Sequence, residues 1–309
     1  MKVNIGLWNM RPWVTGDLAA VLDMTQLADR KGISAISIPD HILMSLNVDK
    51  YPYGKLPVGT DPLSNSEAFF YEPLTLLAAM ASVTERIGLT TNIVVMPVRP
   101  AVFFAKQAAT LDVLSKGRLF LGVGVGWQKE EFDSTNTPWE GRFGYLDEQI
   151  RICKALWSER LVSFQGKYMT LNNVCARPYP LQGAHIPILF GVGPTPRQFR
   201  RIAELGDGWL PDPTIHTPEA LAPHIMALRE AFSEAGRDPA MLQVGVRLNP
   251  IRKKPGDKLA DLEASLAQIP ALRQAGATSV YIYPFHYCAD EREYEPWLDR
   301  MARVVNEAD

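Results

Sequence analysis

Three glycines at alternate positions form the first stretch of this sequence with the character of a binding site. Gly122 ends a short apolar segment predicted to be a strand, and Gly124, Gly126 and Trp127 follow it closely. A glycine has no Cβ atom, so the backbone N–H groups of such a strand end remain accessible. N–H groups of this kind suit a flat or anionic molecule. We therefore expect Gly124 and Gly126 to contact a bound ligand.

A dinucleotide-binding fingerprint is the first alternative for these glycines. That fingerprint requires the spacing G-x-G-x-x-G at the opening of a helix that follows a strand. With Gly122 and Gly124 as the first two glycines, the third position is occupied by Trp127. The spacing argues against a nicotinamide dinucleotide site. A purely structural turn is the second alternative, and the glycines alone do not exclude it.

The elements that must position these residues alternate between strand and helix patterns. Eight strands are predicted at residues 3–7, 35–38, 87–93, 118–122, 187–190, 208–210, 242–248 and 279–282. Helices are predicted at residues 17–31, 72–82, 101–114, 143–157, 195–205, 217–235, 259–275 and 294–306. Such alternation favours a parallel sheet, and eight units favour a closed (β/α)8 TIM barrel.

Two segments lie outside this repeat. Residues 42–71, after the second strand, exceed the usual length of a loop and are predicted to be a functional excursion. Residues 161–171, before the fifth barrel strand, are predicted to form a small hairpin. No shift in composition marks a second domain, so residues 1–309 are expected to form one.

In a barrel of this type the chemistry lies at the carboxyl ends of the strands. The residues predicted there are mainly amides, aromatic residues and glycines: Trp8, Asn9, Asp40, His41, Asn92, Gly124 to Trp127, Gly191 to Gly193, Pro211, Asp212, Asn249, and Tyr283 to His286. They contain no cluster of carboxylates and histidines that suits a metal. A planar aromatic cofactor fits this composition better, and no metal site is predicted.

Composition and charge narrow the classes of partner. The net charge of −2 without a basic block argues against a nucleic-acid partner. The three cysteines, Cys153, Cys175 and Cys288, are far apart and odd in number, which favours a reduced, cytoplasmic location. The first residues lack the pattern of a signal peptide, and no apolar run reaches the length of a membrane span. A cytoplasmic enzyme without a membrane partner is expected.

At this point the sequence resembles a known family, the luciferase-like monooxygenases, which are (β/α)8 barrels that bind FMN or the deazaflavin coenzyme F420. Three segments carry the resemblance, together with the overall strand order: SIPDH, ERIGLTTNIVVMPVRPAVFFAKQAATLDVLSKGRLFLGVGVGW and IPILFGVGPTPRQFRRIAELGDGW. The second segment is long and specific. Within the family, the pattern looks most similar to members described as F420-dependent oxidoreductases, although FMN-using members share it.

The resemblance implies roles for three pairs of residues. Asp40 and His41 match an acidic–histidine pair in which the imidazole faces the reactive edge of the (deaza)flavin, and histidine can exchange a proton near neutral pH. Asn92 and Ile93 match a bulge with a non-prolyl cis peptide behind the ring. Val192 and Gly193 match a Gly-Gly pair before a helix, where valine is a departure. The alternative role for His41 is that of a structural, hydrogen-bonded histidine.

Further residues receive weaker assignments. Thr195 is a predicted helix cap, and the N–H groups behind it make an anion site that fits the cofactor phosphate. Trp127 replaces a glutamate that serves as proton donor in related sugar dehydrogenases, which argues against that mechanism. Glu130 or Glu131, three or four residues later, could replace that proton donor, but both are expected to be surface carboxylates. Tyr283 and His286, like Trp127, are candidates for the substrate pocket, and Asp112 and Arg118 are expected to pair around a turn.

Several functions remain open from the sequence. Reduced FMN with O2 would insert an oxygen atom into a substrate. A flavin or F420 reductase is expected as the partner that supplies the reduced form of whichever cofactor is used. Coenzyme F420 would instead exchange a hydride, with His41 handling the proton. The alternatives are a barrel hydrolase or lyase without a redox cofactor and a non-catalytic flavin-binding protein. The substrate is expected to be a medium-sized organic molecule, and a homodimer follows the habit of the family.

Overall fold

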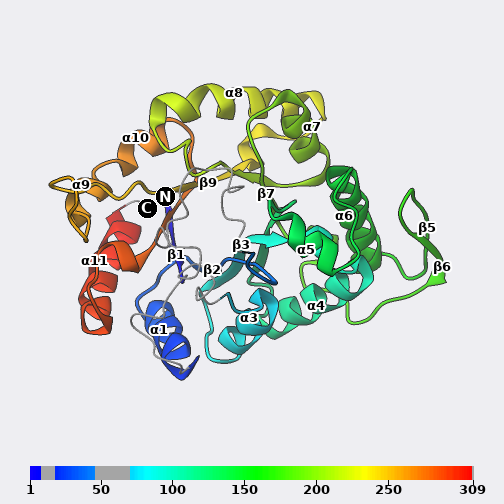
Figure 1. Ribbon diagram of the computed structural model, residues 1–309, viewed down its shortest axis with the longest axis horizontal. Helices are drawn as coiled ribbons and strands as arrows, with labels where there is room; N and C mark the ends of the chain where they lie inside the picture. Colours follow the sequence, from blue (N-terminus) through cyan, green and yellow to red (C-terminus); the bar gives the residue numbers. More distant parts are fainter. Residues whose placement is uncertain (8–17, 46–69, 308–309) are drawn as a thin grey trace.

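The computed structural model describes residues 1–7, 18–45 and 70–307 of the chain. Within them, eight parallel strands close into a barrel in the order β1-β10-β9-β8-β7-β4-β3-β2 (Figure 1). The barrel strands are β1 (Lys2–Gly6), β2 (Ala35–Ile38), β3 (Gly88–Val95), β4 (Leu119–Gly124), β7 (Ile188–Gly191), β8 (Gly208–Leu210), β9 (Gln243–Arg247) and β10 (Ser279–Ile282). The predicted (β/α)8 TIM barrel is confirmed.

Helices surround the barrel on its outside (Figure 1). They are α1 (Leu18–Arg30), α3 (Pro73–Ser82), α4 (Ala101–Leu114), α5 (Lys129–Ser134), α6 (Arg142–Ser158), α7 (Pro196–Leu205), α8 (Pro218–Glu234), α9 (Leu262–Leu266), α10 (Ile269–Gln274) and α11 (Tyr294–Glu307). The strands are covered on both faces, so β2, β8 and β10 are buried along their whole length. None of the helices in the described ranges is long and apolar enough to cross a membrane.

The prediction of one continuous helix over residues 259–275 is wrong. The structure has two short helices there, α9 and α10, with a break between Leu266 and Ile269. Pro270 lies at the start of α10, where its missing N–H group is tolerated. Inside one continuous helix its ring would clash with the carbonyl of Leu266, four residues before it.

The two predicted insertions have different outcomes. Before β7, strands β5 (Val162–Gln165) and β6 (Thr170–Val174) pair antiparallel as a separate two-stranded sheet, which confirms the hairpin. In Figure 1 this hairpin projects away from the barrel beside α6. Most of the predicted excursion after β2 lies at residues 46–69, outside the described residues.

The predicted pairing of Asp112 with Arg118 is wrong, because each has other partners. Asp112 is fully buried, and its carboxylate accepts hydrogen bonds from the backbone N and the Nε2 of Gln182, at 3.1 and 2.7 Å. The Arg118 guanidinium donates to Thr84 Oγ1 at 2.9 Å and to Ile87 O at 2.7 Å. Asp112 thus holds the segment before β7, whereas Arg118 ties the turn after α4, through a hydrogen bond of 2.6 Å from its Nε to Ser115 O, to the segment between α3 and β3.

Asp29 holds the connection between α3 and β3 by capping three successive backbone N–H groups. Its carboxylate accepts from the N–H groups of Glu85, Arg86 and Ile87 at 2.9, 3.0 and 2.6 Å. Burial by itself raises the pKa of Asp29, but these hydrogen bonds and the charge of Arg86 outweigh it and hold the pKa below 3.8. The ionised carboxylate is therefore the form that stabilises the fold.

Replacing Asp29 with asparagine is expected to lower the free energy of unfolding at pH 7 by about 1–3 kcal/mol. A carboxylate whose pKa is depressed on folding stabilises the fold above the unfolded pKa, and this contribution is lost as pH falls through the folded pKa. The difference between wild type and Asp29→Asn should therefore be constant above about pH 5 and shrink below about pH 4. Urea denaturation at several pH values measures it, and a difference that does not change with pH would contradict the assignment.

Candidate active site at the carboxyl ends of the strands

A cavity of about 280 Å³ opens at the carboxyl ends of the barrel strands. The residues that line it follow or end β2, β3, β4, β7, β8, β9 and β10. Those predicted from the sequence to belong to the site and found in its wall are Asp40, His41, Asn92, Ile93, Gly124, Gly126, Trp127, Val192 and Tyr283. The imidazole after β2 and the glycines after β4 thus face one space. Within the described residues, Gly193, Thr195 and His286 are not part of this wall.

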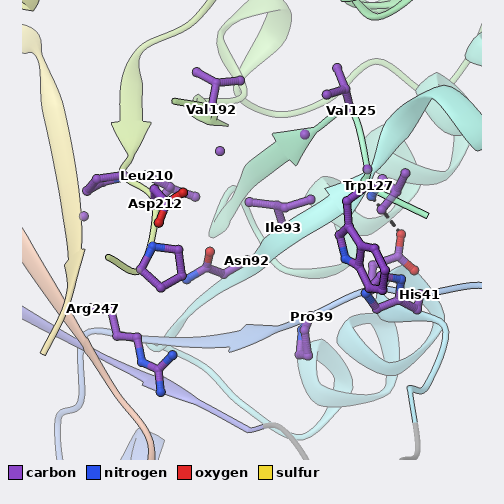
Figure 2. A pocket seen from close by; sticks show the side chains of 18 of the residues that line it. Pro39, His41, Asn92, Ile93, Val125, Trp127, Val192, Leu210, Asp212 and Arg247 are labelled. Carbon is purple, nitrogen blue, oxygen red and sulfur yellow. Dashed lines mark hydrogen bonds between the residues drawn. The ribbon is translucent and has the colours of Figure 1, made fainter. Parts of the chain in front are cut away.

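The end of β3 departs from regular strand geometry inside the cavity. The peptide bond between Asn92 and Ile93 is cis, as the resemblance implies. The register between β3 and β4 also shifts between Thr91 and Val94, which marks a bulge. Figure 2 shows the side chain of Ile93 projecting into the middle of the site, beside Asn92.

The glycines around the cavity are required by this projection. A Cβ atom at Gly124 would lie 2.7 Å from Ile93 Cδ1, and one at Gly191 would lie 2.7 Å from Ile93 Cγ2. Gly126 has a φ of +67°, which a side chain rarely adopts, and its Cβ would meet Val95. The space that the glycines leave is therefore taken first by Ile93 and Val95. A ligand would lie over Ile93 rather than directly against the backbone of Gly124.

Asp40 forms a buried ion pair in the wall of the cavity. Its carboxylate meets Arg99 at two points, Oδ2 to Nη1 at 2.6 Å and Oδ1 to Nη2 at 2.9 Å, and it accepts from Val95 N at 2.9 Å. Burial by itself lowers the pKa of the Arg99 guanidinium, but the hydrogen bonds and charge of Asp40 outweigh it and raise this pKa. The pair joins the loop after β2 to the end of β3. Asp40 therefore holds together the two backbone segments that form this part of the cavity wall.

His41 is held by a buried carboxylate that the sequence analysis assigned to the surface. Glu131, from α5, has a fully buried side chain whose Oε2 lies 3.2 Å from His41 Nδ1, while Oε1 accepts from Ile42 N at 2.8 Å. The expectation that Glu131 is a surface carboxylate is wrong, because α5 folds back across the start of the loop after β2. A carboxylate at Nδ1 selects the tautomer with the proton on that nitrogen, which leaves Nε2 for a ligand.

Gln128 holds the same loop from the other side. Its side-chain oxygen accepts from Ser45 N at 2.9 Å, and its Nε2 donates to Leu43 O at 2.8 Å. With Glu131, three residues later, it fixes the backbone from Ile42 to Ser45. The ring of His41 also meets the edges of Trp127 and Phe70, with ring centroids 5.5 and 4.9 Å apart. His41 is thus fixed in place by contacts from Glu131 in α5, from Trp127 before α5 and from Phe70 before α3.

The predicted phosphate site lies next to the cavity rather than in its wall. Thr195 caps α7 as expected, because its hydroxyl accepts from Gln198 N at 3.3 Å. A Cβ atom at Gly193 would meet nothing within 4 Å, so the space above this glycine is open. Val192, which departs from the glycine of the family pattern, lines the cavity with an apolar side chain. The arrangement leaves room for an anion beside Val192.

His286 is directed to another residue instead of the cavity. It lies in η5 (Pro284–His286), and its Nε2 accepts from Arg247 Nη2 at 3.0 Å. Arg247, the last residue of β9, does line the cavity, and its guanidinium lies 5.2 Å from the centroid of the Tyr283 ring. The ring of Tyr283 in turn occupies the space that a Cβ at Gly6 would need. Arg247 is the wall residue, and His286 supports it.

Gln128, Arg99 and Arg247 are not among the site residues that the sequence predicts, and Glu131 appears there only as an alternative proton donor. The strand that carries Arg247 was predicted to end at residue 248, so Arg247 was placed inside it rather than at its mouth. The segment PVRP contains Arg99 within the specific part of the family resemblance, which was a usable signal. For Gln128 and Glu131 the signal was their spacing of three residues directly after the glycines.

Comparison with known proteins places the chain in context. The model of the luciferase-like monooxygenase family matches residues 8–308. Over 186 residues the chain is 33% identical to an uncharacterised protein of Mycobacterium bovis, a match that covers 59% of this chain and 64% of that protein. The chain therefore spans less than two thirds of the length of this curated relative.

Three solved structures share the fold. The monooxygenase RslO1 from Streptomyces bottropensis has a TM-score of 0.78 at 21% identity, over 100% of both chains. An F420-dependent secondary alcohol dehydrogenase, solved with an F420–acetone adduct, has a TM-score of 0.73 at 18% identity over 99% of each chain. The oxygenating constituent of 3,6-diketocamphane monooxygenase from Pseudomonas putida, solved with FMN, has a TM-score of 0.71 at 15% identity over 98% of this chain and 96% of that chain. At these identities the similarity shows the fold alone.

Proposed function

Since the chain belongs to the luciferase-like monooxygenase family, we propose that it is an oxidoreductase that binds FMN or coenzyme F420 across the barrel mouth. The observation that carries the proposal is the joint position of His41 and the glycine-ended strand β4 in the wall of one cavity. The substrate is a small organic molecule that enters the same cavity.

The wall of the cavity fits a flat tricyclic ring. Figure 2 shows Val125 and Val192 above Ile93, with Trp127 and His41 to one side. These apolar side chains suit the faces of an aromatic ring, while Asn92 and the backbone offer polar groups at its edge. We assign the phosphate of the cofactor to the open space at Gly193 and Thr195, where the Thr195 hydroxyl has a proton to donate.

In this arrangement the protein positions the substrate and the cofactor and transfers the proton. The cofactor, when bound, would supply either hydride exchange or, as reduced FMN with O2, oxygen insertion. Glu131 holds Nδ1 of His41, so Nε2 gives or takes the proton at the reacting molecule. Trp127 and Phe70 fix the ring of His41 and exclude water from one side of it. Asp40 and Arg99 keep the backbone after β2 and at the end of β3 in register.

Titration of the purified protein with FMN, FAD and F420, each oxidised and reduced, tests the proposal. Cofactor absorbance and protein fluorescence report binding without requiring a substrate. Binding of F420 alone would assign the hydride-transfer chemistry, and binding of reduced FMN would assign oxygen insertion. If none of the six forms binds, the proposed function is wrong.

The setting of the enzyme is part of the same proposal. We assign it to the cytoplasm as one domain over residues 1–309, with a flavin or F420 reductase as the source of reduced cofactor. Cys153, Cys175 and Cys288 are free thiols, which is compatible with a reducing compartment.

A homodimer is proposed from the outer face of α4. Val102 and Phe103 at its start and Val113 and Leu114 at its end are exposed apolar side chains. The two pairs are eleven residues apart, three turns of the helix, so they lie on one face. Light scattering should give the mass of two chains, and the mass of one chain at micromolar concentration would contradict the proposal.

A further inference from the structure

Arg247 brings a positive charge to the cavity without a carboxylate partner among the described residues. Its side chain is half-buried and lines the wall. Its contacts are a hydrogen bond to His286 Nε2 at 3.0 Å and the ring of Tyr283, whose centroid lies 5.2 Å from the guanidinium carbon. Charged groups that are removed from water are usually paired, and arginine in particular binds carboxylates and phosphates through two parallel hydrogen bonds.

His286 supports the guanidinium without neutralising it. Burial, together with the charges of Arg247 and Arg252, lowers the pKa of His286 to about 3. At neutral pH the imidazole is therefore uncharged, and its Nε2 accepts a hydrogen bond from Arg247. The contact orients the arginine side chain and leaves its positive charge available to the cavity.

Neither of the two carboxylates that line the cavity, Asp40 and Asp212, forms an ion pair with Arg247. Asp40 is paired with Arg99 through both of its oxygens. Asp212 accepts from the backbone N and the hydroxyl of Thr214 through Oδ1, at 2.8 and 2.7 Å. Figure 2 shows Arg247 across the site from His41, with Asn92 and Ile93 between them. A molecule that reaches from His41 to Arg247 would therefore place its far end on a cation.

We propose that Arg247 binds an oxyanion, a carboxylate or phosphate, on the far end of the substrate, whose apolar body lies over Ile93. This rests on the proposed function only in treating the bound molecule as a substrate. The same oxyanion chemistry has a second source, the phosphate of the cofactor. The open space at Gly193, on the side of Val192, suits that phosphate, so we assign the Arg247 site to the substrate.

Benzoate and benzamide test the oxyanion site, because they share a shape and differ in charge. Calorimetric titration of the cofactor-free and the FMN-loaded protein should show benzoate binding about 10- to 100-fold more tightly than benzamide. The variant Arg247→Met should lose this preference, and Arg247→Lys should keep most of it. The matched control is Arg252→Met, which removes an exposed cation that also acts on His286 and should leave the preference unchanged.

A second pair of ligands separates the two sources of the oxyanion. Arg247→Met should bind FMN and riboflavin as the wild type does, which also shows that its pocket is intact. If the variant loses affinity for FMN and not for riboflavin, Arg247 holds the cofactor phosphate and the assignment to the substrate is overturned.

Absence of benzoate binding, equal affinities for benzoate and benzamide, or a preference that survives in Arg247→Met also overturns the proposal. Failure of the proposed function would be seen separately, as failure of the wild type to bind any cofactor. The comparison of benzoate with benzamide on the cofactor-free protein would still decide the role of Arg247.

Discussion

Replacing His41 with alanine is expected to lower kcat by about 10²- to 10⁴-fold, the range for removal of a positioned general acid or base. Under the proposed function, cofactor affinity should change little, because the contacts proposed for the ring are mainly apolar and the phosphate site proposed at Gly193 does not involve His41. Stopped-flow measurement of cofactor reduction or reoxidation with the cognate substrate separates the two effects. His185→Ala, at an exposed position before β7, is the matched control. Full turnover by His41→Ala would remove His41 from the chemistry.

The variant Glu131→Gln tests the role of His41 in a second way, through the carboxylate that contacts its Nδ1. The glutamine keeps an oxygen for Ile42 N, so the loop after β2 should stay in place, but the carboxylate at His41 Nδ1 is lost. Turnover should fall by about 10- to 100-fold, as for other buried partners that orient a functional histidine. Glu130→Gln makes the same change one residue away and should have little effect. If the role of Glu131 is purely structural, Glu131→Gln should instead lower the stability of the protein and leave the turnover of the folded enzyme unchanged.

Replacing Asp40 with asparagine is expected to lower the free energy of unfolding by about 3 kcal/mol, because the buried guanidinium of Arg99 then keeps the partly exposed Glu72 as its remaining carboxylate partner among the described residues. Asp40 and Arg99 are both buried, and two contacts of 2.6 and 2.9 Å join them. The loss should appear as a shift of the urea midpoint with an unchanged slope.

Glu72→Gln is the matched control for Asp40→Asn. Glu72 meets the same guanidinium, with Arg99 Nη2 to Oε1 at 3.1 Å, but its side chain is 39% exposed. An ion pair at such a position contributes about 0–1 kcal/mol. The glutamine also keeps an oxygen for Thr75 N, so the cap of α3 is retained. Equal losses from the two variants would show that burial of the Asp40–Arg99 pair has no special weight.

The sequence by itself determined the architecture and one side of the candidate site. Alternation of apolar strands and amphipathic helices predicted the barrel, since each period is a local property of the chain. Because parallel strands bring their carboxyl ends to one face, the same pattern predicted that His41 and Gly124 lie at one mouth. The resemblance to the luciferase-like family added the cis peptide at Asn92–Ile93. The helix break at Pro270 was also within reach, because its cause is local.

The tertiary structure alone decided which charges meet. Glu131 reaches His41 across 90 residues of sequence, and Arg99 reaches Asp40 across 59. These pairings depend on how α5 and the end of β3 turn after their strands, and loop geometry leaves no periodic pattern. Arg247 was missed because its strand ends at Arg247 instead of at residue 248, as the sequence predicts, and successive side chains of a barrel strand point alternately into the barrel and toward the helices. The periodic pattern of apolar residues depends on neighbours in the chain, whereas the partners of buried charged side chains depend on how the closed barrel brings distant segments together.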